Sequence, residues 1–508
     1  MDTTSARGSS AAAQTATDTV AADDAETLKC YDVAVIGGGV VGHGIARAVR
    51  LSGRSVALID DSPGSGASWA AAGMLAPVSE LHYQEEALLE LMLESSRLWP
   101  AFAAGLDAGL DAGLGAGRGR GAGVAGTGYL TTPTLAVGAD AADRRALADL
   151  CAVQQAHGLA VEPLTVRAAR VREPFLSPGI SCAFDIPADH QVDPRRLLGR
   201  INELLANDDG CRIISRRAAG LLWEDGRVAG ARLAGGGSIR AGETIVANGL
   251  GAAALADLPS GLRLPLRPVH GDILRLRVPE QLRPLLTSTV RGLVRGVPVY
   301  LVPRPDGTVV IGATQREDAL GEESRTAAPA GSNHARSHAP RSNQTPSNHA
   351  RSNPADSAVS AGGVYQLLRD AQQLVPAVAE LELLEATARA RPGTPDNAPL
   401  LGRVAEPGRH RDVAGLIIAT GFFRHGILLT PAAAEICRQL LDGVVDPRWE
   451  HFRPDRFAAG TTVAGPPSAG PPSSGPHSAG PPASGPPETA PGYADRRNTT
   501  PEHSKETV

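Results

Sequence analysis

Three closely spaced glycines and one downstream aspartate are the first residues whose types and spacing suggest chemistry. Gly37, Gly39 and Gly42 have the spacing G-x-G-x-x-G, and Asp60 follows 21 residues after Gly39. The first glycine permits a tight turn, the second lets backbone approach a pyrophosphate, and the third lets a helix pack against a strand. A carboxylate in the last position can accept hydrogen bonds from ribose hydroxyls. Because no arginine cluster lies near Asp60, the pattern favours FAD or NAD over NADP.

The elements around these glycines are those that such a site requires. Residues 32–36 (DVAVI) form a short β-branched run, typical of a buried parallel strand. A helical pattern over 40–53 follows and ends at Gly53, and a second strand is expected at 55–59. The N-terminus of the helix, with Val40 and Val41, would offer free N–H groups to the phosphates. The alternative is a glycine-rich turn in an ordinary βαβ unit.

Two further segments favour FAD over NAD. An NAD dehydrogenase would continue after Asp60 with another strand and helix, whereas residues 62–77 are a run of small residues suited to backbone lying against a large flat ligand. Far downstream, a strand at 416–419 leads through a loop containing Gly421 to a helix expected to start near residues 426–427. The positive end of that helix would stabilise the negative charge of a reduced flavin.

Composition excludes several classes of protein. The net charge is −5, which argues against binding driven by nucleic-acid phosphates, and no run of 18 apolar residues predicts a membrane span. The N-terminal residues lack a basic start followed by an apolar stretch, so we expect no secretory signal and a cytoplasmic location. The isolated cysteines predict reduced thiols, with no disulfide framework and no metal site. They are Cys30, Cys151, Cys182, Cys211 and Cys437.

Three low-complexity segments are predicted to be disordered, because Pro/Ser/Gly-rich repeats bury too little apolar surface to offset their ordering entropy. These are residues 1–28, 324–358 and 459–508. The histidines of the second could instead bind a metal, and the third could be a ligand for a proline-reading module. The Gly/Ala-rich residues 104–126 are expected to form a surface loop. What remains suits two interleaved domains.

Several sequence blocks carry a family resemblance. The chain resembles the glycine oxidase branch of the D-amino acid oxidase family, which acts in thiamine biosynthesis, over about residues 31–450. The matching blocks are VIGGGVVGHGIA, ASWAAAGMLAP, PLRPVHGDIL (265–274), VYLVPRPDGTVVIGAT (299–314), ARPGTPDNAPLLGR (390–403) and ATGFFRHGILLTPAAA (419–434).

The resemblance implies an α/β flavoprotein of two domains. A discontinuous Rossmann-like FAD-binding domain would comprise residues 29–100, 190–262 and 388–457. A mixed or antiparallel sheet with helices would form an α+β substrate domain from residues 101–189 and 263–387, interrupted by the insert at 324–358.

Oxidation of an α-amino acid requires that the Cα–H points at a hydride acceptor, and a carboxylate is best oriented by an arginine fork. The resemblance implies that Arg391 binds the substrate carboxylate, that the Tyr300 hydroxyl supports it, and that Arg424 lines the site. The competing interpretations are a surface ion pair, a core tyrosine and a helix-start contact. No acid or base is assigned, because hydride transfer from a neutral amine needs none.

The same resemblance implies a set of residues that contact the flavin. Ala219 would contact its adenosine half, although the local alignment is loose. The others are Ser68, Ala71, Ala72, Gly73, Met74, Gly421, Phe423, Arg424, His425, Gly426 and Ile427.

Departures from the family pattern leave the substrate open among glycine, sarcosine and a small D-amino acid. They are Phe422, Pro298, Gln315 and the residues after Asn248. With glycine the reaction would consume O₂ and yield glyoxylate, ammonia and H₂O₂ through an imine. FAD is expected to be noncovalent, because Cys437 falls inside a predicted helix. The alternatives are a D-amino acid dehydrogenase and a flavin-binding scaffold without turnover; a homo-oligomer is compatible with the resemblance.

Overall fold

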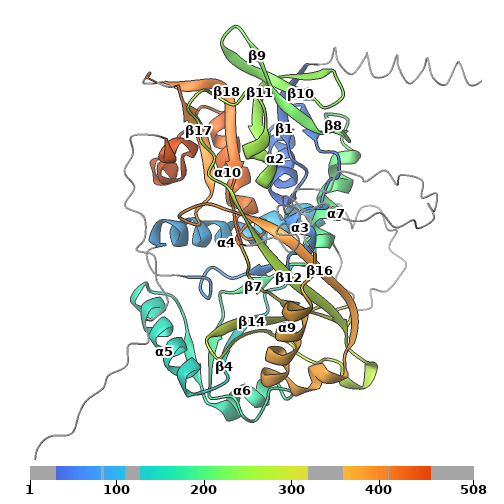
Figure 1. The fold of residues 1–508 in the computed structure, drawn as a ribbon, viewed down its shortest axis with the longest axis vertical. Helices are drawn as coiled ribbons and strands as arrows, with labels where there is room; N and C mark the ends of the chain where they lie inside the picture. The colour runs from blue at the N-terminus through green and yellow to red at the C-terminus, as the bar shows by residue number, and fades with distance from the viewer. Residues whose placement is uncertain are drawn as a thin grey trace, which may run out of the picture. The chain divides into compact units, whose positions relative to one another are not determined.

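The computed structural model describes residues 30–81, 85–108, 126–317, 358–406, 408–409 and 411–458. The predicted disordered segments 1–28 and 459–508 therefore lie outside the described residues, as does 324–358 except for Ala358. The predicted βαβ unit is present (Figure 1): strand β1 (Cys30–Ile36), helix α2 (Val40–Leu51) and strand β2 (Val56–Ile59). The helix ends at Leu51, two residues before Gly53, which has a φ of 87°.

The first of two large sheets contains this unit. Its strand order is β17-β18-β11-β1-β2-β8, and β10 pairs with both β11 and β9. The β18–β11–β1–β2–β8 pairs are parallel and the remaining pairs are antiparallel. Its further strands are β8 (Cys211–Ile214), β9 (Ala218–Glu224), β10 (Arg227–Leu233), β11 (Ser238–Val246), β17 (Leu400–Ala405) and β18 (Asp412–Thr420).

The second sheet is mixed, as the sequence predicts for the substrate domain. Its order is β16-β12-β15-β14-β13-β4-β6-β5, and only the β13–β4 pair is parallel. The strands are β4 (Thr134–Gly138), β5 (Glu162–Leu164), β6 (Cys182–Ile186), β12 (Arg267–Arg277), β13 (Thr289–Val294), β14 (Val297–Pro303), β15 (Thr308–Gly312) and β16 (Glu382–Gly393). The domain boundary predicted at 387/388 falls inside β16.

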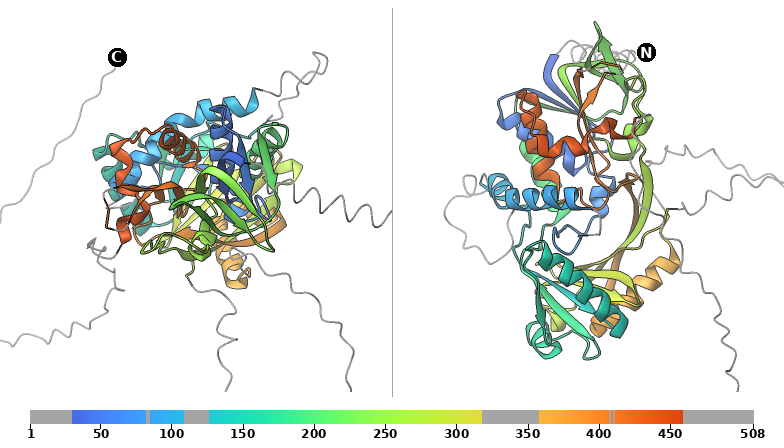
Figure 2. Two further views of the ribbon diagram at one scale, coloured as in Figure 1. Left: turned by 90° about the horizontal axis from the view of Figure 1, so that it is seen from above. Right: turned by 90° about the vertical axis from the view of Figure 1, so that its left-hand side faces the viewer.

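Helices cover both sheets. Buried side chains of α2, α4, α7 and α10 form one core with the first sheet, while α5 and α9 lie against the second (Figure 2, right). A third, two-stranded antiparallel sheet is formed by β3 (Met74–Leu75) and β7 (His190–Gln191). The helices are α3 (Ala67–Ala70), α4 (Glu86–Asp107), α5 (Ala141–Ala156), α6 (Val166–Arg172), α7 (Pro194–Ala206), α9 (Ala361–Leu374) and α10 (Thr430–Leu441), with 3₁₀ turns at Gly249–Ala254, Glu280–Leu282, Pro376–Glu380, Pro447–Phe452 and Pro454–Phe457.

One loop expectation was wrong at its start. Residues 104–107, expected to open a Gly/Ala-rich loop, continue helix α4. Leu106 is buried in the core, and the Asp107 carboxylate accepts a hydrogen bond from the backbone N–H of Thr127 (2.9 Å). Packing of this last turn therefore outweighs the local glycine content. Of the remainder, residues 109–125 lie outside the described part of the chain.

The expected start of the last long helix was also wrong. Helix α10 begins at Thr430, not near residues 426–427, which form a turn. Pro431 lies in the first helical turn and has no N–H to bond the carbonyl of Ile427, so the regular helix starts later.

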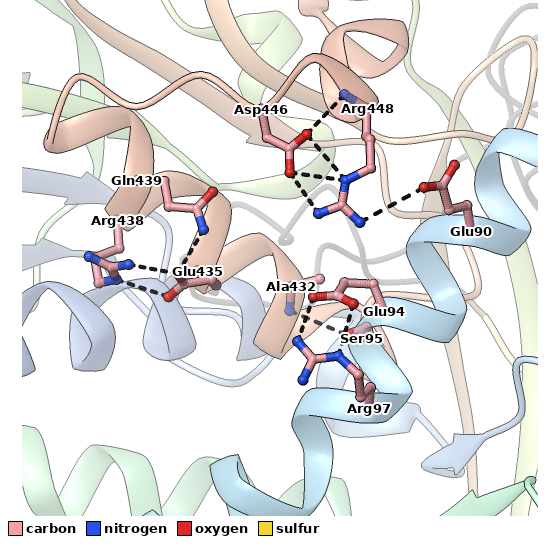
Figure 3. A network of polar contacts seen from close by, with 10 residues as sticks. All are labelled: Glu90, Glu94, Ser95, Arg97, Ala432, Glu435, Arg438, Gln439, Asp446 and Arg448. Atoms are coloured by element: carbon pink, nitrogen blue, oxygen red, sulfur yellow. Dashed lines mark hydrogen bonds and ion pairs between the residues drawn. The ribbon is translucent and has the colours of Figure 1, made fainter.

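Helix α4 holds that turn in place. Ser95 Oγ and Trp99 Nε1 both donate to the carbonyl oxygen of Leu428, at 2.6 and 2.8 Å. Ser95 Oγ also accepts from the backbone N–H of Ala432 at 3.2 Å (Figure 3). Helices α4 and α10 therefore position the turn between β18 and α10.

We predict that Gly42→Ala destabilises the protein, because its Cβ would collide with the carbonyl oxygen of Gly37 at the end of β1. The expected loss is about 2 kcal/mol in the free energy of unfolding, measured by urea denaturation. Gly199→Ala is the matched control: this helical glycine has open space around its Cβ, so alanine should be neutral or stabilising. Equal stability of the two variants would contradict the close α2–β1 contact.

Candidate functional site

A cavity of about 1000 Å³ opens at the carboxyl ends of four parallel strands of the first sheet and reaches the second sheet. Residues that directly follow β1, β2, β11 and β18 line it: Gly37, Asp60, Ala247 and Gly421. This edge is where open α/β sheets bind their ligands. Tyr300 of β14 and Arg391 of β16 line it from the other sheet.

Nearly every residue proposed from the sequence lines this cavity. Gly42 is the exception, because it lies at the contact between α2 and the end of β1 and does not face the cavity. Those lining it are Gly37, Gly39, Val40, Val41, Asp60, Ser68, Ala71, Ala72, Gly73, Met74, Ala219, Tyr300, Arg391, Gly421, Phe423, Arg424, His425, Gly426 and Ile427.

The N-terminus of α2 has the features of a pyrophosphate site. A Cβ on Gly37 would collide with the backbone of Ala247, so only glycine permits this turn, which has a φ of 113°. The N–H of Val40 donates to Ser68 Oγ (3.1 Å), which ties the small-residue segment to the helix. The neighbouring amides of the first turn have no intrahelical acceptor and are free to bind an anion.

Asp60 is held in a fixed orientation at the end of β2. Its carboxylate accepts from the N–H of Gly38 (2.6 Å) and from the N–H of Ser62 (2.7 Å). These two bonds fix the side chain at the edge of the sheet, where a carboxylate can accept hydrogen bonds from ribose hydroxyls. The position and charge of Asp60 thus fit the predicted ribose contact.

Four arginines hold the small-residue segment against the cavity, and sequence reasoning missed all of them. Arg195 Nε and Arg275 Nη2 donate to the carbonyl oxygen of Trp69, at 3.1 and 3.2 Å. Arg389 Nε donates to that of Ser65 (3.1 Å), and Arg304 to that of Ala72. Arg275, Arg304 and Arg389 belong to the second sheet or directly follow one of its strands, so that sheet positions a wall of the cavity. Arg304 lies in the block at 299–314, but no local motif marks Arg195, Arg275 or Arg389 among the other arginines.

The turn between β18 and α10 lines the opposite part of the cavity. Gly421 has a φ of 73° and Phe423 a φ of 47°, and the N–H of Phe423 donates to the carbonyl of Pro392 (3.0 Å). Among the described residues, none accepts a hydrogen bond from the backbone N–H of Gly426, Ile427 or Leu428. These amides precede α10 and suit an anionic or carbonyl edge of a bound ligand.

Arg391 and Tyr300 reach the cavity from strands of the same sheet. The guanidinium of Arg391 lies over Gly271 of β12, where any side chain would displace it, and Nη1 contacts the carbonyl oxygen of Thr314 (3.5 Å). Tyr300 lies over Gly312 in the same way. Burial raises the pKa of Tyr300, against the opposing charge of Arg391, so the phenol keeps its proton at neutral pH. Gly271 and Gly312 therefore leave room for the side chains of Arg391 and Tyr300, which are the two residues proposed to bind the substrate.

Arg424 lines the cavity but has protein partners. Its Nε lies 2.9 Å from Glu80 Oε2 and its Nη2 3.8 Å from Glu85 Oε2. Glu80 also pairs with Arg291 of β13, and both residues line the cavity. Sequence reasoning missed Glu80 and Arg291: Glu80 follows the ASWAAAGMLAP block by three residues, and Arg291 belongs to no motif. Arg424 is thus placed at the site as an ion-paired residue.

Residues at which the chain departs from the expected family pattern also lie here. The cavity is also lined by Pro298, Gln315, Phe422 and Asn248. The side-chain oxygen of Asn248 is buried and accepts no hydrogen bond from any described residue. Cys437 is buried in α10 away from the cavity wall, and burial raises the pKa of its thiol to about 12. A neutral, buried thiol is poorly suited to a covalent flavin link.

Within the described ranges, no helix is both long and apolar enough to cross a membrane. The described residues likewise hold no group of three or more His, Cys, Asp or Glu side chains arranged to bind a metal ion.

Comparisons with known proteins agree with this geometry. A family model described as FAD dependent oxidoreductase matches residues 32–440. The chain is 30% identical over 415 residues to a glycine oxidase of Geobacillus kaustophilus, covering 81% of this chain and 93% of that protein. It is 29% identical over 429 residues to the bifunctional protein ThiO/ThiG of Trichormus variabilis; these cover 84% of this chain, which spans only 55% of that relative. The crystal structure of the G. kaustophilus glycine oxidase superposes with a TM-score of 0.65 at 28% identity, covering 83% of this chain and 98% of that one.

We predict that Asp60→Ala weakens FAD binding, because the ribose loses a charged acceptor and Gly38 loses its hydrogen-bond partner. The expected cost is about 2 kcal/mol, or roughly 30-fold in Kd, measured by fluorescence titration of the apoprotein with FAD. The control is Glu224→Ala, which removes a carboxylate paired with Arg240 on the same sheet, away from the cavity wall. An unchanged affinity for FAD in Asp60→Ala would contradict the predicted contact between Asp60 and the ribose.

Proposed function

The chain belongs to the FAD-dependent oxidoreductase family, and on that premise we propose that it is a glycine oxidase. The proposed reaction is glycine + O₂ + H₂O → glyoxylate + NH₃ + H₂O₂, with an imine intermediate. The names of its relatives, glycine oxidase and ThiO/ThiG, support a role in supplying that imine for thiazole synthesis in thiamine formation.

One observation carries the proposal most directly. Among the residues that the structure describes, no carboxylate lies within ion-pair distance of Arg391, although this residue lines the cavity and is half-buried. An arginine without an acidic partner in such a place suits a carboxylate brought by the substrate. The protonated phenol of Tyr300 can donate a second hydrogen bond to the same carboxylate.

The residues around the cavity divide the remaining work. FAD, when bound, supplies the acceptor for the hydride that leaves the substrate Cα. Gly37, Gly39 and Asp60 would hold its pyrophosphate and ribose, while the arginine-held segment at 65–74 and the turn at 421–428 would contact the flavin. Buried Phe422 and Phe423 restrict water on the substrate side. Arg391 and Tyr300 orient the substrate, and proximity is the main catalytic device.

The positive charge of Arg391 also selects the substrate's protonation state. A neutral amine with an ionised carboxylate matches one guanidinium, whereas a protonated amine would be repelled by the same charge. Neutral amine is the form that can release a hydride from Cα, so no general base is required from His425. Pro298 and Gln315, both in the cavity wall, bear on the choice among glycine, sarcosine and small D-amino acids.

We also propose the domain limits inferred above. The FAD-binding domain would comprise 29–100, 190–262 and 388–457, and the substrate domain 101–189 and 263–387. The strands of the first sheet all fall in the former set, and those of the second fall in the latter except for the end of β16. A cytoplasmic location and a homo-oligomeric state remain further predictions.

The experiment that tests the function is the visible spectrum of the purified protein before and after anaerobic addition of glycine. We expect an oxidised flavin band that bleaches, because hydride transfer from glycine reduces the flavin. If the band stays oxidised with glycine but bleaches with sarcosine or D-alanine, glycine is not the substrate and the amine that bleaches the band takes its place. A band that no amine bleaches would favour a scaffold without turnover.

We predict that Arg391→Ala raises the KM for glycine while the flavin spectrum is retained, because the substrate carboxylate loses its partner and the residues proposed to hold the flavin are unchanged. A rise of about 100-fold is expected from the loss of one charge-assisted bidentate contact. Arg277→Ala, an exposed position on the same sheet, is the matched control and should leave KM unchanged. An unaltered KM in Arg391→Ala would exclude this arginine from the substrate site.

A further inference from the structure

A second charged group faces the substrate end of the cavity, and the reaction proposed above does not use it. The Glu80 carboxylate lies between the guanidiniums of Arg291 and Arg424, and all three residues line the cavity. Burial raises the pKa of Glu80, but the two guanidiniums outweigh it and hold that pKa well below the usual range. Glu80 is therefore an ionised acid inside the cavity wall.

The position of this cluster is close to the proposed substrate ligands. Arg291 and Tyr300 form a directly opposed pair on the antiparallel strands β13 and β14, so their side chains project from the same face of the sheet. The charge of Glu80 also raises the pKa of Tyr300, which places the carboxylate within electrostatic reach of the phenol. The cluster thus borders the space in which the substrate carboxylate would bind.

The backbone that carries Glu80 is held by another buried acid. The Asp189 carboxylate accepts from the N–H groups of Val78 (2.9 Å) and Ser79 (3.0 Å), directly before Glu80. Asp189 is therefore a positioning residue for the segment. With its backbone held from one side and its carboxylate paired from two others, Glu80 has little freedom to turn away from the cavity.

The two guanidiniums of the cluster are paired with carboxylates of the chain. Arg291 and Arg424 face Glu80 and Glu85, and the buried Asp189 adds a further acid that acts on Arg291. Arg391 is left as the cation available to one substrate carboxylate. If the charge of Glu80 were absent, two adjacent guanidiniums would gain capacity to bind a second carboxylate. With Glu80 present, that second carboxylate meets a like charge in low-dielectric surroundings, which disfavours it strongly.

We propose that Glu80 is a specificity-determining residue that restricts the site to amines bearing a single carboxylate, and that Arg291 positions it. The inference rests on the proposed function for the identity of the site. It predicts that an amine diacid is rejected by charge at Glu80 and that removing this charge admits it.

Binding of two unreactive ligands tests the inference. Methoxyacetate and diglycolate differ by one carboxylate, contain no amine and cannot donate a hydride, so perturbation of the flavin band in the holoenzyme reports affinity alone. In the wild type, diglycolate should bind more weakly than methoxyacetate. In Glu80→Gln, which keeps the side-chain size, the ratio of the two affinities should move toward diglycolate by roughly 30-fold or more.

Two further variants make the result specific. Adding Arg291→Gln to Glu80→Gln should reverse much of the gain for diglycolate, because one of the two released guanidiniums is removed. Asp370→Asn is the matched control, since Asp370 is also a buried carboxylate between two arginines, Arg295 and Arg369, but lies on α9 away from the cavity wall. It should leave the ratio unchanged.

The possible outcomes separate this inference from the proposed function. A ratio that stays within twofold in Glu80→Gln, or that shifts equally in Asp370→Asn, overturns the role of Glu80. If methoxyacetate fails to perturb the flavin band of the wild type, the proposed carboxylate-binding site at Arg391 is rejected, and the inference about Glu80 is rejected with it. If the ratio shifts as expected while glycine leaves the flavin oxidised, Glu80 keeps its role and glycine oxidation is rejected.

A kinetic comparison adds a second readout. Sarcosine and iminodiacetate are secondary amines that differ by the second carboxylate. The ratio of their kcat/KM values should move toward iminodiacetate in Glu80→Gln, mainly through KM, because the flavin and Arg391 are untouched. An equal fall for both substrates would indicate a merely structural role.

Discussion

The close approach of helix α2 to strand β1 is the constraint on which the site depends. Gly42 lies against the carbonyl of Gly37, and Gly37 in turn lies against the backbone after β11. These contacts admit no Cβ, and they bring the first turn of α2 to the carboxyl edge of the sheet. FAD binding at that edge follows from free amides and a helix dipole that point at one place.

The second sheet completes the site from the opposite side. Its Arg275, Arg304 and Arg389 donate to three carbonyl oxygens of the segment at 65–72, and the carbonyl of Pro392 accepts from the N–H of Phe423 in the turn before α10. Both walls of the flavin site are therefore tied to the sheet that supplies Arg391 and Tyr300. This coupling fixes the proposed substrate ligands, Arg391 and Tyr300, relative to the cofactor site, which is what an enzyme relying on orientation requires.

Charge balance decides what the remaining space can accept. Several guanidiniums border the cavity, and most of them are committed to carbonyl groups or to the carboxylates of Glu80 and Glu85. Arg391 differs because its one hydrogen bond to the described chain is a long contact of 3.5 Å with the carbonyl oxygen of Thr314, which leaves most of its donors available. Charged groups buried at such a site are costly unless they are paired, so the pairing of the other guanidiniums favours Arg391 as the proposed partner of a carboxylate ligand.

By itself, the sequence determined the α/β class, the βαβ unit, the cofactor and a set of site residues of which all but Gly42 line the cavity, because these depend on local glycine spacing, strand periodicity and contiguous motifs. Local pattern was less reliable for the start of α10, where Pro431 delays the helix, and for the end of α4, where burial of Leu106 extends it. Only the tertiary structure decided the partners of Arg424, the inclusion of Glu80 and Arg291, and the arginines that hold residues 65–72. These contacts join residues more than 100 positions apart, and one arginine in a sequence looks like another until folding brings a carboxylate or a carbonyl group to it.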